Sequence, residues 1–123
     1  MSFEIPGQVI TLEAGQDLSA KQYYFVSLAS DGQVDPTGAG LGVDGVLQDD
    51  PAVAGYGALV MINGVSKVVA GAVITRGADV ASDASGKAVA STSGDYIVGT
   101  ALEAATADGD IIAVLITRAG RTA

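Results

Sequence analysis

The side chains of this chain that could do chemistry are almost entirely acidic, because it contains neither histidine nor cysteine. Without these two residue types it lacks imidazole bases, thiol nucleophiles and the usual zinc ligands. Fourteen Asp and Glu residues remain, and two carboxylates can in principle perform acid–base catalysis. They are spread over turn-like segments, and nothing in the sequence selects one pair. We therefore predict no catalytic residues, no metal site, no cofactor and no enzymatic activity.

Two kinds of segment look like ligand-binding loops but do not meet the requirements of such loops. Gly86-Lys87 matches the end of a phosphate-binding loop, which also needs an earlier glycine and a Ser or Thr after the lysine. Those two positions are Ala81 and Ala88. The acidic stretches 49–50 and 79–83 lack the alternating oxygen ligands and final Glu of a calcium-binding loop. We interpret all of these segments as solvated turns.

The charge of the chain argues against nucleic acid and membrane partners. Its net charge is −8, and its six basic residues are scattered along the sequence, whereas nucleic-acid binding usually needs a basic stripe. No apolar run approaches the ~18 residues that span a bilayer, and the first residues do not resemble a signal peptide. We predict a protein that is made in the cytosol and binds neither partner.

Short apolar and β-branched runs, bounded by Gly, Asp and Pro, predict about eight or nine strands and no helix. The fold class is therefore all-β, a small barrel-like or sandwich-like domain with an extended N-terminal arm. We divide the chain into an arm with the first strand (1–20), the barrel-like domain (21–117) and a short basic tail (118–123). The expected strand units are 8–12, 21–28, 43–48, 58–62, 65–69, 71–80, 83–89, 96–102 and 110–117.

The strongest local signal is Asn63-Gly64 between the apolar runs 58–62 and 65–69. This dipeptide favours a type I′ turn, which predicts a hairpin that pairs Ile62 with Val65. Both faces of that hairpin would be mostly apolar, whereas a hairpin on a monomer's surface should have one polar face. We therefore expect a neighbouring subunit to cover one face. The hairpin residues predicted for this contact are Leu59, Met61 and Val68.

Aromatic residues and the C-terminal arginines provide further candidates for contacts. In the predicted strand 21–28, Tyr23 and Phe25 would share one face, and part of this aromatic surface could lie at a subunit interface, where Tyr and Phe are enriched. Arg118 and Arg121 form a small basic end on an acidic chain. They are either a solubilising tail or an anchor for an acidic surface on a partner.

Several glycine-spaced motifs occur between residues 42 and 116 in a specific order. They are GVDGVLQ at 42–48, GYG at 55–57, GAVITRGADV at 71–80, the turn at 83–86, GTALEAA at 99–105 and GDIIAVLI at 109–116. In this order and spacing the chain resembles the capsid cement, or head decoration, family of tailed bacteriophages.

The resemblance implies a structural role, which would explain the lack of catalytic side chains. It implies a homotrimer that binds the major capsid protein on the outer surface of the assembled shell and stabilises it. The protein would be in the host cytoplasm before assembly and on the virion afterwards. In this family an N-terminal arm commonly reaches across neighbouring capsid subunits. Here that role would fall on Met1, Ser2, Phe3, Glu4, Ile5, Pro6 and Val9.

The alternative is a non-catalytic β-barrel binding module of a phage or bacterial assembly. Residues 69–80 faintly resemble half of a biotinyl or lipoyl carrier domain. Carriers present a lysine at a hairpin tip, but the expected tip is Asn63-Gly64, and Lys67 lies beyond it. A carbohydrate-binding module usually exposes planar aromatics, and this chain has few. Mass measurement for a group on Lys67, sizing and sedimentation with phage heads would separate these possibilities.

Overall fold

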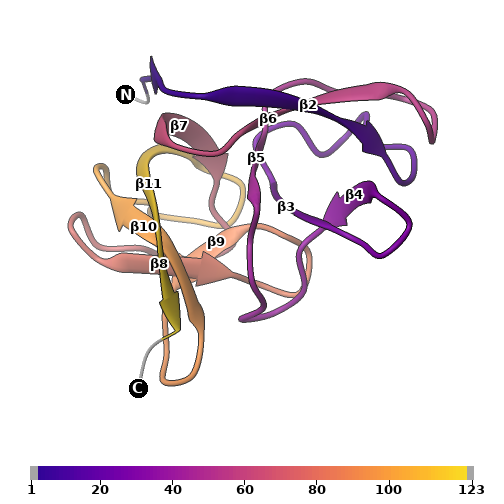
Figure 1. Ribbon diagram of the computed structural model, residues 1–123. Helices are drawn as coiled ribbons and strands as arrows, with labels where there is room; N and C mark the ends of the chain where they lie inside the picture. Colours follow the sequence, from indigo (N-terminus) through magenta and orange to yellow (C-terminus); the bar gives the residue numbers. More distant parts are fainter. Residues whose placement is uncertain (1–2, 122–123) are drawn as a thin grey trace.

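The computed structural model describes residues 3–121, with side chains as far as Arg118. This part of the chain is all-β, as predicted, with eleven strands and no helix (Figure 1). It accordingly holds no helix long and apolar enough to cross a membrane. The strands are β1 (Ile5–Pro6), β2 (Val9–Ala14), β3 (Phe25–Leu28), β4 (Gln33–Pro36), β5 (Gly45–Leu47), β6 (Gly57–Met61), β7 (Gly64–Val69), β8 (Asp79–Ser82), β9 (Ala88–Ala90), β10 (Tyr96–Ala101) and β11 (Ile111–Arg121).

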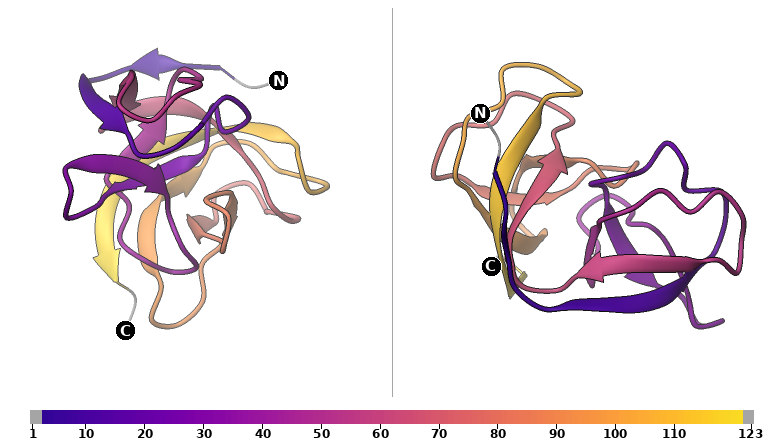
Figure 2. Two further views of the ribbon diagram at one scale, coloured as in Figure 1. Left: turned by 90° about the vertical axis from the view of Figure 1, so that its right-hand side faces the viewer. Right: turned by 90° about the horizontal axis from the view of Figure 1, so that it is seen from above.

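The strands form two units that lie side by side, as the right-hand view of Figure 2 shows. Five strands close into a small barrel in the order β2-β4-β3-β5-β6. The other six form a sheet in the order β1-β7-β11-β10-β8-β9. This sheet is curled, because a bridge between Ala70 and Ala88 brings the end of β7 to β9. Among the first six strands, β2 to β6 form the barrel and β1 joins the sheet.

Alternation along the barrel strands produces two apolar cores. Val26 points into the barrel, whereas its neighbour Phe25 points outward against the sheet, since successive strand residues face opposite sides. The core inside the barrel comprises Ala14, Leu18, Val26, Val34, Leu47, Ala58 and Val60. The core between barrel and sheet comprises Phe25, Val43, Val46, Met61, Val68, Ala70, Ile74, Val80, Ala88, Val98, Ala101, Ala105, Ile112, Val114 and Ile116. The outer side of the barrel thus packs against the inner side of the sheet.

The predicted hairpin at Asn63-Gly64 is wrong, because β6 and β7 belong to different units. β6 pairs with β2 and β5, and β7 pairs with β1 and β11. Gly64 does adopt a positive φ of 97°, but a Cβ at this position would collide with the backbone of Ile5 and Gly7. The Asn63 side chain accepts a hydrogen bond from the Gln8 amide at 2.5 Å. The Asn-Gly pair therefore lets the N-terminal segment pass close to the start of β7 and does not form a tight hairpin turn.

The predicted strand 21–28 begins only at Phe25, because Tyr23 has a left-handed backbone with φ of 68°. The Tyr23 amide donates to the carbonyl of Leu47 at 2.7 Å, and its carbonyl accepts from the amide of Val69 at 3.0 Å. Tyr23 thus links the barrel to the edge of β7. It does not share a strand face with Phe25, which corrects the predicted alternation.

Candidate docking surfaces

An apolar surface covers the outward side of β1, β7 and β11, which we call the sheet face. Ile5 lies opposite Val65, and Val65 lies opposite Leu115, so that one row crosses three strands. Directly opposed residues of antiparallel strands project to the same side of the sheet. Ile5 is 62% exposed and Leu115 38%, and Ile111, which lies four residues before Leu115 on the same side of β11, is 46% exposed. This sheet therefore has apolar side chains on both of its sides.

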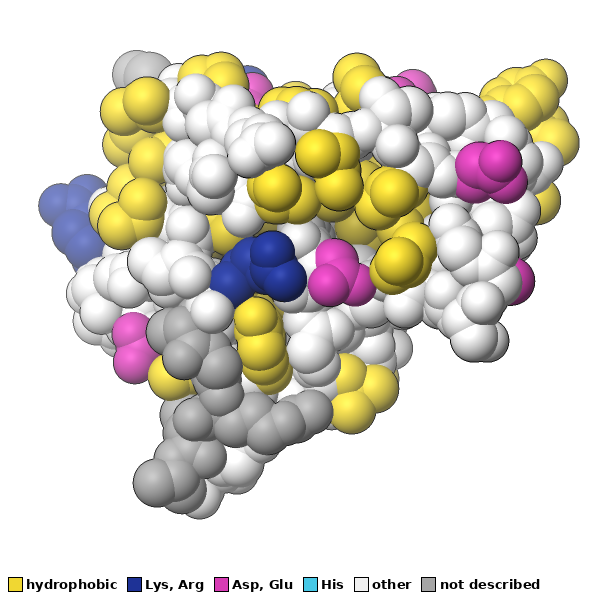
Figure 3. All heavy atoms as spheres, viewed as in Figure 1, with side chains coloured by type: hydrophobic (Ala, Val, Ile, Leu, Met, Phe, Trp, Pro, Cys, Tyr) yellow, Lys and Arg dark blue, Asp and Glu magenta, His cyan; other side chains and the backbone are white. Residues whose placement is uncertain are grey.

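A second exposed apolar area lies on the outside of the barrel along β2 and β6, which we call the barrel face. Leu59 is 42% exposed opposite Thr11, and Val9 is 41% exposed at the start of β2. Val53 and Tyr56 continue the area into the loop before β6 and are also exposed. Figure 3 shows hydrophobic side chains gathered over β5 and β6 and at the upper right of the view.

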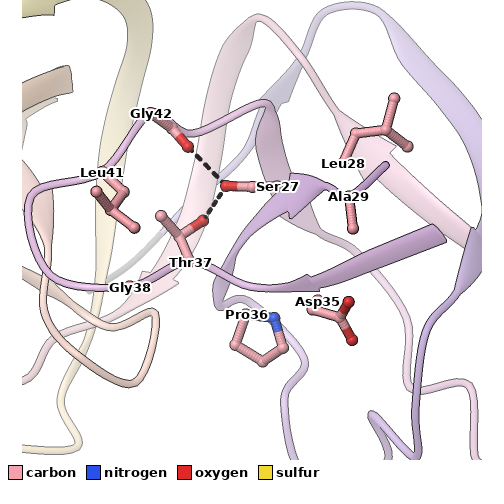
Figure 4. A pocket seen from close by; sticks show the side chains of 9 residues that line it. All are labelled: Ser27, Leu28, Ala29, Asp35, Pro36, Thr37, Gly38, Leu41 and Gly42. Carbon is pink, nitrogen blue, oxygen red and sulfur yellow. Dashed lines mark hydrogen bonds between the residues drawn. The ribbon is translucent and has the colours of Figure 1, made fainter. Parts of the chain in front are cut away.

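A small hollow opens between β3, β4 and the loop that follows them (Figure 4). Its volume is about 240 Å³, and Leu28 and Leu41, both about half exposed, lie at its sides. The Ser27 hydroxyl donates to the carbonyl of Gly42 at 2.6 Å and lies 2.6 Å from the Thr37 hydroxyl. These hydroxyls are satisfied within the chain. The hollow consequently offers an apolar contact rather than a set of free polar groups.

Arg118, one of the predicted anchors, lies near the hollow at an irregular point of β11. The pairing of β10 with β11 shifts register between Ile97 and Gly99, and Arg118 has a positive φ of 49°. Its guanidinium lies 3.7 Å from a carboxylate oxygen of Asp44, whose other oxygen accepts from the Leu28 amide. An exposed ion pair at this distance contributes little stability. The side chain of Arg121 lies outside the described part.

The residues predicted for a subunit contact are divided between core and surface. Phe25, Met61 and Val68 are buried in the chain's own core, at 0%, 2% and 0% exposure. Their assignment to a subunit interface is corrected accordingly, because no surface of these side chains is available. Leu59 is exposed on the barrel face, and Tyr23 is half-buried at the edge of β7.

The predicted N-terminal arm is extended, but its described residues are paired with both units. Ile5 and Pro6 form β1 on the sheet, and Val9 opens β2 in the barrel. Phe3 is exposed and Glu4 half-buried ahead of β1. Met1 and Ser2 lie outside the described residues. The arm thus connects the sheet face to the barrel face.

Ile111 and Leu115 are candidate contact residues that the sequence reasoning did not select. Their signal was the unbroken apolar run Ile111–Ile116, in which both alternating sets of side chains are apolar. One set, with Ile112 and Val114, fills the core. The other set then has to face outward, as Ile111 and Leu115 do.

Several acidic residues accept hydrogen bonds within turns in the part of the chain that the structure describes. Asp110 accepts from the backbone amide and the hydroxyl of Thr106 at 2.8 and 2.9 Å and from the amide of Ala107. These hydrogen bonds lower the pKa of Asp110. Lys87 donates to Asp108 at 2.9 Å, which raises the pKa of the lysine. Residues 3–121 hold no cluster of three or more side chains suited to a metal ion.

Lys67, which a carrier domain would have to present at a hairpin tip, lies in the middle of β7. It is paired with Ala113 of β11 and is half-buried. A carrier domain would present this lysine on a protruding turn, whereas here it is held within a sheet. The structure therefore provides no support for the carrier alternative.

Comparison with known proteins assigns the family. The sequence profile of the phage cement protein family matches residues 6–116. The chain belongs to the phage cement protein family. This result agrees with the resemblance carried by residues 42–116, and it gives the cement protein a structural role on the phage capsid.

The comparison of structures supports the fold. The crystal structure of the N-terminal base of head fiber protein gp8.5 of bacteriophage phi29 matches with a TM-score of 0.71 and 19% identity. The match covers 94% of this chain and 98% of the phi29 chain. At this identity the likeness concerns the fold alone. No curated protein sequence matches the cement protein.

Proposed function

We propose that this cement protein binds the outer surface of the assembled major capsid shell as a homotrimer and so stabilises the shell. The observation that carries the proposal is the presence of two exposed apolar faces on a body that consists of a closed barrel and a curled sheet. Exposed apolar patches on small proteins commonly mark contacts with other proteins. A trimeric cement protein needs two such contacts, one with its own copies and one with the shell.

We assign the barrel face and the adjoining arm to the shell. Val9 and Leu59 are exposed on neighbouring strands, and Val53 and Tyr56 extend the same area. Three linked copies would multiply individually weak contacts of this kind through their effective concentration. The protein would be made in the host cytoplasm and join the virion once the shell has formed.

Sedimentation with undecorated phage heads tests this assignment. The wild-type protein should sediment with the heads, and Leu59→Ser should bind roughly tenfold or more weakly, because the proposal places Leu59 at the centre of the shell contact. Val73→Ser is the matched control, because Val73 is 68% exposed on a loop outside both faces. Equal binding of all three proteins would contradict the role of the barrel face, and no binding of the wild type would contradict the proposed function.

Deletion of residues 1–7 tests the arm separately. The deletion removes β1, whereas the pairing of β2 with β6 is retained. We expect a folded barrel and weaker sedimentation with heads. Because Ile5 also belongs to the sheet face, sedimentation velocity of the shortened protein alone establishes whether its assembly has changed as well. Unchanged binding by the shortened protein would show that the arm does not contact the shell.

A further inference from the structure

The three lysines of the chain lie together around two adjacent tyrosines, although they are far apart in the sequence. The Lys21 ammonium lies 4.9 Å from the centre of the Tyr24 ring, and that of Lys67 lies 5.9 Å from the Tyr23 ring. Lys87 joins them because the amide of the next residue after Tyr24 donates to the carbonyl of Gly86 at 2.7 Å. We call this group the lysine–tyrosine cluster; its members are Lys21, Tyr23, Tyr24, Lys67 and Lys87.

The lysine–tyrosine cluster adjoins the sheet face. Lys67 projects from that face opposite Ala113, with Val65 and Val69 two residues to either side on β7. Tyr23 accepts from the Val69 amide and so lies along the same edge of β7. The sheet face thus combines the exposed apolar side chains of Ile5, Ile111 and Leu115 with Lys67 and Tyr23 at the edge of β7. Protein interfaces commonly combine apolar and aromatic side chains with polar ones at the rim.

The charges of the cluster favour an acidic partner. Lys87 is paired with Asp108, but Lys21 and Lys67 form no ion pair with any residue in the described part. Two sheet faces that met symmetrically would place these lysines against each other, which is unfavourable. The rest of each copy is strongly acidic, since the net charge is −8 although all three lysines lie at this one place. A second copy therefore offers a complementary surface, provided that it uses a different region.

We infer that the sheet face and the lysine–tyrosine cluster form one half of a head-to-tail contact, in which the other half is an acidic surface of the next copy. Contacts between two different surfaces of identical subunits generate closed rings such as trimers. The inference rests on the proposed homotrimer. It adds which surface makes the contact and the charge of the surface that it meets.

The test compares the assembly state of variants by sedimentation velocity over a range of micromolar concentrations. Lys21→Gln/Lys67→Gln removes two positive charges from the cluster of each copy and should weaken the trimer about threefold or more, because each exposed ion pair contributes little but every contact of the ring loses two of them. Arg76→Glu changes the net charge by the same amount at an exposed position outside the cluster and should assemble like the wild type. Circular dichroism verifies that each variant is folded.

Each result separates the inference from the proposed function. A double variant that is folded and forms trimers as readily as the wild type overturns the inference, and the proposed function stands. If that variant forms trimers but no longer sediments with undecorated heads, the cluster contacts the shell instead, and the inference is again overturned. If the wild type binds heads but is a monomer at all concentrations, the contact between copies is excluded and shell binding remains.

Discussion

The barrel and the sheet of this cement protein bury their apolar side chains to different extents. The barrel closes on itself, and its interior core of seven residues is enclosed by five strands. The sheet stays open at β1, and its central strands β7 and β11 carry apolar side chains on both sides. A closed barrel satisfies its own backbone and buries its own interior. The open sheet has one apolar side left over, which is why we connect it with assembly.

The two units nevertheless depend on each other. Phe25, Val46 and Met61 lie on the outer side of the barrel, yet all three are buried against the sheet. The larger of the two cores therefore belongs to both units. We therefore expect the barrel and the sheet to unfold together.

The largest effect should come from Phe25→Ala, because the Phe25 ring is fully buried between the two units. Truncation of a buried Phe typically costs about 3–5 kcal/mol. Urea unfolding followed by tyrosine fluorescence should show one transition at a lower midpoint. Leu18→Ala, inside the barrel, should also unfold in one transition. A separate early transition of the sheet in Phe25→Ala would contradict the shared core.

A smaller effect should come from glycine substitutions that distinguish the units. A Cβ at Gly99 on β10 would collide with the backbone carbonyl of Leu115 on β11, so Gly99→Ala should cost about 1–3 kcal/mol. At Gly57 on β6 a Cβ would approach only the Thr11 methyl, at 3.4 Å. Gly57→Ala should therefore change the free energy of unfolding by less than about 1 kcal/mol. Equal losses in thermal melts would contradict the close approach of β10 and β11.

Ile111→Ser should separate stability from assembly. Ile111 is 46% exposed on the sheet face, so its replacement should cost about 1 kcal/mol or less of the free energy of unfolding. Assembly of the trimer should nevertheless weaken, as measured by sedimentation velocity. Ile112→Ser, at the next and buried position, should instead destabilise the fold. If Ile111→Ser destabilised the fold as much, the outward orientation of Ile111 would be wrong.

The smallest expected effect is a loss of folding stability at acidic pH. The pKa of Asp110 in the sheet unit and that of Asp17 in the barrel unit are lowered in the folded chain, by hydrogen bonds from Thr106 and from Ser19 respectively. A carboxylate with a lowered pKa stabilises the fold above its unfolded pKa and loses that contribution as the pH falls through the folded value. Stability should therefore fall below about pH 4.

Asp110→Asn should reduce this acid sensitivity more than Asp17→Asn, because Asp110 accepts three hydrogen bonds and Asp17 accepts its bonds from Ser19 alone. Melting temperatures measured between about pH 3 and pH 7 would show it as a shallower decline. An unchanged decline in Asp110→Asn would mean that other carboxylates dominate.

The sequence predicted most strands of the sheet, because alternation and glycine boundaries are local features. The segments 96–102 and 110–117 correspond closely to β10 and to most of β11. The segment 71–80 did not form one strand, since only its last residues join β8. The segment 33–36, which is not among the expected strand units, forms β4, which closes the barrel through a parallel pairing with β2. Such a pairing between distant segments has no local signal.

The pairing partners of β6 and β7, which Asn63-Gly64 connects, could not be predicted either, because most of them also lie far away in the sequence. The dipeptide permits a sharp change of direction whether the next strand returns to the same sheet or enters another. The choice depends on Gly7, whose backbone occupies the space beside Gly64. The predicted contact residues failed with the hairpin, because Met61 and Val68 face the shared core. Leu59, which was predicted for a subunit contact, is exposed on the barrel face.

Heat treatment of undecorated phage heads, with and without the protein, measures cement function most directly. The account predicts that heads mixed with saturating wild-type protein stay intact to a higher temperature than bare heads, as observed by electron microscopy and light scattering. Leu59→Ser, added at the same concentration, should protect them less. Heads that come apart at the same temperature whether or not folded wild-type protein is present would contradict the account.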